Sequence, residues 1–117
     1  MQAALVEQLP AAQVASHKVW LAAFRNSLAD LLLARDQCDE AKTLAEQTIS
    51  SLTALLQANP DMWYLHALLA DSDRMRSTAL RRTGHSAEAD AAQRSEEQHR
   101  RAQRAAQPGP QATTRPE

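Results

Sequence analysis

Apolar residues recur at helical spacing through most of the chain, and the first stretch runs from Ala11 to about Arg35. In this stretch they return every three or four residues and form one stripe along a helix. The stripe consists of Val14, Leu21, Phe24, Leu28, Leu31 and Leu32. Pro10 comes just before it, near a helix start, where the missing N–H of proline is tolerated. We expect a long amphipathic helix whose large apolar side chains face the core.

A second apolar stripe follows a polar turn at residues 36–39 and runs to about Ala58, with Asp39 as the predicted N-cap. Its members are Ala41, Leu44, Ala45, Thr48, Ile49, Leu52, Leu55 and Leu56. Asn59-Pro60-Asp61 then interrupts the pattern. Asparagine can cap a helix, proline suits the first helical position, and aspartate opposes the positive helix N-terminus. A third helix is therefore predicted to start there.

The third helix is predicted to end near Gly84, because glycine readily takes the left-handed conformation that closes a helix. Ser86 can cap a fourth helix that ends near Ala106 and has an apolar stripe made almost only of alanine. Since this stripe buries little area, we expect the distal half of the helix to fray. The proline-rich residues 108–117 are predicted to be a disordered tail, and residues 1–107 a single domain. The apolar positions of these two helices are Leu65, Leu68, Leu69, Met75, Ala79 and Leu80, then Ala89, Ala92, Ala102 and Ala106.

An internal repeat emerges when the second and fourth helices are superposed on their first residues. Glu40-Ala41 then matches Glu88-Ala89, and the offset is 48 residues. With the same offset, Leu32 falls on Leu80 and Leu21 on Leu69. The predicted fold is therefore all-α, with about four helices arranged as two antiparallel helical hairpins.

The two turns and the alanines that follow them resemble a tetratricopeptide-like repeat. Asp39-Glu40-Ala41 and residues 84–89 are similar to that family's turn and its small residue at a close helix crossing, and Asn59-Pro60 resembles the end of a repeat. The chain departs from the family pattern in three ways: its repeat is longer than the usual ~34 residues, Asp36 replaces a glycine, and Gln93 stands where a large aromatic is preferred. The resemblance implies a right-handed array of stacked hairpins that acts as a protein–protein interaction or scaffold module.

The same resemblance implies where a partner would bind, because the first helix of each hairpin lines a concave groove. The matching positions are Asn26, Asp30, Asp71 and Arg74. Two units are fewer than such arrays normally need. We therefore expect the terminal part of a longer array, similar to repeats appended to bacterial regulatory proteins and kinases, or a homo-oligomer. Trp63 and Tyr64 are expected in the core where the hairpins meet rather than in a partner patch.

Composition narrows the functional classes. The chain has only two glycines, so it has no glycine-rich loop to cradle a nucleotide phosphate. Cys38 is the single cysteine, which excludes an intramolecular disulfide and suits a reducing compartment. The first residues lack the features of a signal peptide, and the longest apolar runs are far shorter than the ~20 residues that cross a bilayer. We expect a soluble cytoplasmic protein.

No catalytic, cofactor-binding or metal site is expected, and hence no enzyme. The four histidines are distributed over different predicted elements: His17, His66, His85 and His99. None has a second histidine at i+4, or the accompanying Cys or Glu ligands that a zinc site needs. Cys38 has no histidine close in sequence that would activate a nucleophile.

A small DNA-binding regulator is the alternative function. Residues 80–89 superficially resemble a helix-turn-helix, and residues 72–117 carry nine basic and six acidic side chains, against four and eight in residues 1–71. A recognition helix should offer long polar side chains at its N-terminal end, yet this one offers mostly alanine. Later arginines could contact phosphates; these are Arg94, Arg100, Arg101 and Arg104. Nucleic-acid binding is the less favoured interpretation.

Overall fold

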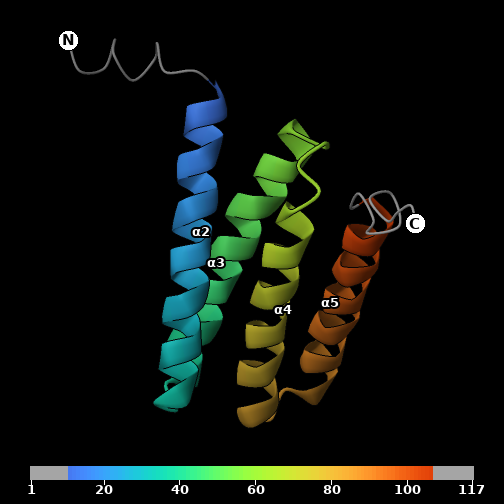
Figure 1. Ribbon diagram of the computed structural model, residues 1–117. Helices are drawn as coiled ribbons and strands as arrows, with labels where there is room; N and C mark the ends of the chain where they lie inside the picture. Colours follow the sequence, from blue (N-terminus) through green and yellow to red (C-terminus); the bar gives the residue numbers. More distant parts are fainter. Residues whose placement is uncertain (1–10, 107–117) are drawn as a thin grey trace, which may run out of the picture.

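The computed structural model describes residues 11–106, which form four α-helices. These are α2 (Ala11–Ala34), α3 (Cys38–Ala58), α4 (Leu65–Arg82) and α5 (Ser86–Ala106). Successive helices run antiparallel, with α2, α4 and α5 side by side and α3 behind α2 and α4 (Figure 1). The prediction of an all-α chain with about four helices is confirmed. The tail predicted at residues 108–117 lies outside the described residues.

The four helices do not contribute equally to the packing. α2, α3 and α4 each contact the other two, whereas α5 packs closely against α4 alone among the described helices. Two larger apolar clusters fill the space between α2, α3 and α4, one at each end of these helices. The third cluster, between α4 and α5, consists of Leu80, Ala89 and Ala92. The predicted apolar faces of α3 and α4 are confirmed as core faces.

The predicted core face of α2 is wrong. Leu21, Phe24, Leu28 and Leu31 are exposed, and the helix turns the opposite face to the core. That buried face consists of Ala15, Ala22, Asn26, Ala29 and Leu33. Alanines lack bulk, so they let the backbone of α2 approach α3 and α4 closely. Because α2 is apolar on two opposite faces, periodicity alone does not indicate which face is covered.

Two of the predicted helix starts also differ from the structure. Gln37 rather than Asp39 precedes α3, without a side-chain capping bond, and Asp39 lies in the first turn, where its charge still opposes the helix dipole. α4 begins at Leu65, several residues after Asn59, because the connection 59–64 forms separate turns. The side-chain amide of Asn59 donates to the Leu55 carbonyl at 3.0 Å, so this residue ends α3 instead of starting α4.

The turns of the two hairpins have the same backbone geometry. Asp36 and Gly84 both have positive φ, at 61° and 85°. The N–H of Gln37 donates to the Leu32 carbonyl at 2.8 Å, and the N–H of His85 donates to the Leu80 carbonyl at the same distance. These hydrogen bonds satisfy carbonyls at the helix C-terminus, as in a Schellman motif. The turns therefore repeat with the predicted offset of 48 residues.

The alanines that follow the two turns also match. Ala41 and Ala89 are both fully buried, as expected for residues at close helix crossings. At the second crossing, the Ser77 hydroxyl donates to the Ala89 carbonyl at 3.1 Å, which holds α5 directly against α4.

Candidate functional site

A hollow of about 240 Å³ lies between α2 and α4, the first helices of the two hairpins. Its lining consists of Ala23, Asn26, Ser27, Asp30, Leu68, Asp71 and Met75. Three of the four predicted partner-contact residues are thus brought together. Arg74 is not among them, because it lies on the α5 side of α4 and lines a separate groove.

Asn26 forms the buried floor of this hollow. Its Oδ1 accepts a hydrogen bond from the Ser72 hydroxyl at 2.7 Å, and its Nδ2 donates to the Leu68 carbonyl at 3.2 Å. Both bonds cross from α2 to α4. The amide is therefore engaged in holding the two helices together, which an asparagine on a buried face must do to offset the cost of its desolvation.

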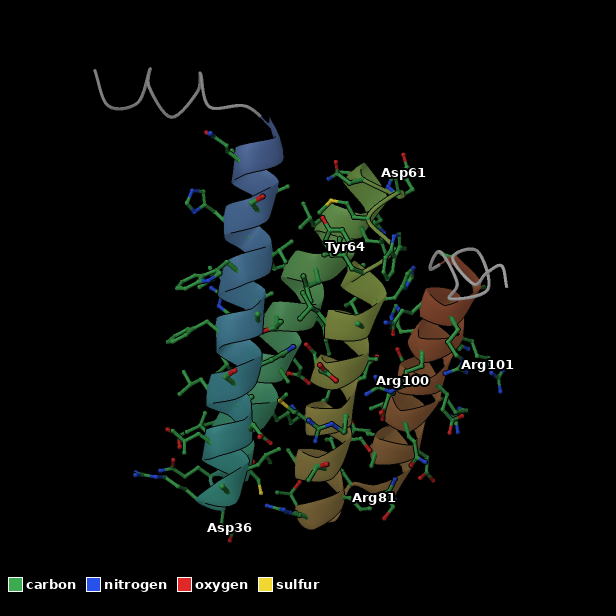
Figure 2. All side chains as sticks on the ribbon, viewed as in Figure 1. Asp36, Asp61, Tyr64, Arg81, Arg100 and Arg101 are labelled. Atoms are coloured by element: carbon green, nitrogen blue, oxygen red, sulfur yellow. The ribbon has the colours of Figure 1, made fainter. Side chains whose placement is uncertain are left out.

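Asp30 and Asp71 place carboxylates at the rim of the hollow, one on each helix. Asp30 is exposed and forms no ion pair within residues 11–106, whereas Asp71 accepts from the Arg100 guanidinium at 3.2 Å. Arg100 also pairs with Glu96 at 3.1 Å. Burial acts to lower the pKa of Arg100, but the hydrogen bonds to Asp71 and Glu96 outweigh it and raise the pKa. Figure 2 shows Arg100 on the side of α5 that faces α4.

A larger groove of about 550 Å³ separates the exposed edges of α4 and α5. Arg81 pairs with Asp90 at 3.1 Å, and Arg82 donates to the Leu33 carbonyl at 2.8 Å near the end of α2. The lining consists of Arg74, Ser77, Thr78, Arg81, Arg82, Gln93, Glu96 and Glu97. This face of the stack is therefore strongly polar, and two of its arginines are already engaged by the fold.

A polar cluster at the α4–α5 contact was missed from the sequence. His66 and His99 meet with their Nδ1 atoms 2.9 Å apart, and their rings are tilted against one another. Nearby, the buried Asp73 accepts a hydrogen bond from the Ser95 hydroxyl at 2.7 Å. Burial raises the pKa of Asp73 and lowers the pKa of His99, although the charge of Asp73 opposes the latter shift. The signal in the sequence was His99 itself, which breaks the alanine stripe on the inner face of α5.

The described residues offer no arrangement of metal ligands. Residues 11–106 contain no group of three or more His, Cys, Asp and Glu side chains that could hold an ion. Cys38 is buried, and its thiol donates to an Asp36 carboxylate oxygen at 3.7 Å.

The two aromatic residues before α4 differ from expectation. Trp63 is half-buried and packs edge-to-face against Tyr64, with 6.0 Å between ring centroids, but Tyr64 is exposed. The expectation that both lie in the core is therefore wrong for Tyr64. It lies at the end of the connection between α3 and α4, just before α4 begins (Figure 2).

Comparison of this chain with family models, with curated protein sequences and with solved structures finds no match. The fold of residues 11–106 defines the class as an all-α protein, and the two helical hairpins in this part of the chain share the same turn. No helix in the described part of the chain is both long enough and apolar enough to span a bilayer.

Proposed function

We propose that this chain is a protein-interaction module of the tetratricopeptide-like type, whose partner segment binds in the hollow between α2 and α4. The observation that supports this function best is the position of the hollow: it lies between the equivalent helices of two hairpins with the same turn. In such arrays the first helices line the binding surface. A right-handed array, a place at the end of a longer bacterial regulatory protein and a cytoplasmic location belong to the same proposal.

The chemistry of the hollow favours a basic side chain from the partner. Asp30 and Asp71 place negative charge at its rim, and Leu68 and Met75 provide an apolar wall. A lysine or arginine can pack its aliphatic stem along such a wall while its charged head approaches a carboxylate. Ala23 and Ser27 are small enough to leave that path open. The volume suits a single side chain.

The DNA-binding alternative is less well supported. A helix-turn-helix crosses its two helices at about 90–120°, whereas α4 and α5 lie side by side along most of their length (Figure 1). Of the arginines expected to contact phosphates, Arg100 is engaged within the fold, where it pairs with Asp71. Arg81, next to the turn, pairs with Asp90. Arg101, by contrast, points away from α4 toward solvent (Figure 2), which is the position that a phosphate contact requires.

A peptide array that compares lysine- and arginine-containing segments with their glutamate counterparts tests the proposal. The full chain should retain basic peptides. Asp30→Asn should weaken retention about tenfold or more, since a charge-assisted hydrogen bond contributes about 1.5–3 kcal/mol. Asp71→Asn should weaken it less, because Asp71 already pairs with Arg100. Asp61→Asn is the matched control, because Asp61 is an exposed carboxylate on the α3–α4 connection, outside the hollow. Its retention should equal that of the wild type.

A second measurement tests the alternative function, the small DNA-binding regulator. A salt titration of duplex DNA binding, run beside the array, should show little affinity. Tight DNA binding that falls steeply with added salt, together with no retention of any peptide, would replace the interaction module with the DNA-binding function.

A further inference from the structure

The outward face of α2 carries a continuous apolar surface, here called the outer stripe: Trp20, Leu21, Phe24, Leu28 and Leu31. Trp20 is 73% exposed, Phe24 57% and Leu31 53%. The rings of Trp20 and Phe24 are stacked, with centroids 6.3 Å apart and planes within 8° of parallel. Figure 1 shows α2 at the edge of the described stack. The stripe presents roughly 500 Å² of apolar surface, which is within the range of the largest apolar patch on a monomer, a patch that is often functional.

The internal repeat relates the outer stripe of α2 to a face of α4 that is buried. With the 48-residue offset, Leu21 of the stripe corresponds to Leu69 of α4, and Leu31 corresponds to Ala79. Leu69 and Ala79 are fully buried, in the two apolar clusters that α4 forms with α2 and α3. The face of α4 that the first hairpin covers is therefore the same face that is bare on α2. A second apolar face on a helix that already buries one is typical of a covered position.

The opposite face of the stack does not fit this surface. The residues of the first hairpin that contact α4 include Leu33 and Ala45, and the offset carries these positions to Arg81 and Gln93. Arg81 and Gln93 line the polar groove between α4 and α5. Head-to-tail stacking of copies would press the outer stripe onto charged side chains and remove them from water without new partners, which is costly. The apolar outer stripe therefore fits the outer stripe of a second copy better than it fits the polar face of α4 and α5.

We propose that two copies of this chain associate through the outer stripe of α2, with the two Phe24 rings near a twofold axis. The stripe extends four residues from Phe24 to Trp20 in one direction and seven to Leu31 in the other. A twofold axis near Phe24 therefore pairs the two stripes over residues 20–28 and leaves Leu31 at each end of the contact. Lys18, Arg25 and Asp30 lie off the stripe on the flanks of the helix. A standard interface buries about 800 Å² per partner, and smaller contacts are typical of weak, transient association. The stripe alone is smaller than that standard. The pair is therefore a reversible dimer, and it does not depend on peptide binding in the hollow.

Sedimentation equilibrium of the full chain over a concentration series tests this pairing. The wild type should pass from 12.9 kDa to twice that mass as its concentration rises. Phe24→Glu should weaken association at least tenfold while circular dichroism and thermal unfolding stay as in the wild type. Tyr64→Glu is the matched control, because Tyr64 is also an exposed aromatic residue but lies outside α2. It should dimerise like the wild type.

Each other outcome overturns the proposal. If the wild type stays monomeric throughout the series, two copies do not associate through the outer stripe. A different protein would then be the partner that covers it. A mass that grows beyond the dimer indicates open-ended stacking. A Phe24→Glu variant that still dimerises places the interface elsewhere. Should Phe24→Glu lose helicity, Leu31→Gln at the end of the stripe gives an independent measurement, with the same expected weakening.

Peptide retention measured on the same variants keeps this proposal separate from the proposed function. A monomeric Phe24→Glu chain that still retains basic peptides confirms the dimer contact independently of the hollow. A wild-type dimer that retains no peptide leaves the pairing intact and contradicts the proposed function alone.

Discussion

Asp36 and Gly84 hold the same left-handed backbone conformation at the same point of their hairpins, with φ of 61° and 85°. In each case the next N–H reaches back to a carbonyl of the preceding helix at 2.8 Å. Glycine takes this conformation freely, whereas a side chain meets the backbone there at a cost of roughly 1–2 kcal/mol. Aspartate is one of the few residues that tolerates it, and its carboxylate accepts a bond from the Cys38 thiol.

Asp36→Gly should therefore stabilise the chain by about 0.5–1 kcal/mol, since glycine relieves the strain at a smaller cost in unfolded-state entropy. Gly84→Ala should destabilise it by about 1–2 kcal/mol. No atom lies within 4 Å of a Cβ built at Gly84, so this cost comes from the backbone alone. Urea unfolding of both variants measures the effects. Equal stability of the two variants would contradict the strain argument.

The close crossing of α4 and α5 at Ala89 should not tolerate a larger side chain. Ala89 is fully buried, and the Ser77 bond to its carbonyl fixes the distance between the helices. Ala89→Leu should cost about 1–3 kcal/mol by overpacking, and so should Ala41→Leu in the first hairpin. Ala91→Leu serves as the control, because Ala91 is exposed two residues further along α5. Neutral results at both buried alanines would remove the argument that the hairpins cross closely there.

The pattern of the sequence predicted the helices better than their contacts. The positions of α3 and α5 and the repeated turn follow from local signals, chiefly stripe spacing and Gly84. The orientation of α2 does not follow from local signals, because its alanine face and its leucine face have similar helical periodicity. Packing against α3 and α4 decides which of the two faces is buried. His66 and His99 are far apart in sequence, so their meeting depends on tertiary packing. Three of the residues that line the hollow, Asn26, Asp30 and Asp71, were named from the sequence. They were named because the tetratricopeptide-like resemblance places the first helices of the two hairpins along one surface.

Asn26 should prove structural although it lies in the proposed binding hollow. Asn26→Ala removes two hydrogen bonds between α2 and α4 and leaves buried polar groups with fewer partners, which should cost about 1–3 kcal/mol. Ser27→Ala, at the exposed neighbouring position, should stay within about 0.5 kcal/mol of the wild type. Chemical denaturation distinguishes them. If Asn26→Ala instead weakened peptide retention at unchanged stability, Asn26 would be a direct partner contact.

Stability should fall as the pH drops from neutral through the ordinary range of histidine, because of the cluster at the α4–α5 contact. Burial lowers the pKa of His99 in the folded chain, so the unfolded chain takes up a proton first and is favoured as the pH falls through its ordinary pKa near 6.5. Protonation of His99 would also leave its Nδ1 unable to accept in the contact with His66. The charges that face this cluster are Asp73 and Arg76 from α4 and Glu96 from α5.

Asp73 acts in the opposite sense at lower pH. Burial raises the pKa of its carboxyl, so the folded chain binds a proton while the unfolded chain, with the ordinary value of 3.8, is still charged. Stability lost through His99 is then partly recovered as the pH falls toward that value. The raised pKa also means that, at neutral pH, the buried charge of Asp73 lowers the stability of the folded chain relative to a neutral side chain. Asp73→Asn should therefore raise the thermal midpoint at neutral pH.

Thermal unfolding across this pH range should separate the two groups. His99→Gln should flatten the decline between neutral pH and about 5, since it removes the histidine with the lowered pKa. Asp73→Asn should steepen the same decline, because the charge of Asp73 is what favours protonated His99 in the folded chain. His17→Gln, on the exposed side of α2, should reproduce the wild-type curve. If His99→Gln and the wild type declined in parallel, the pH dependence would arise from other groups, and the contact between His66 and His99 would have no part in it.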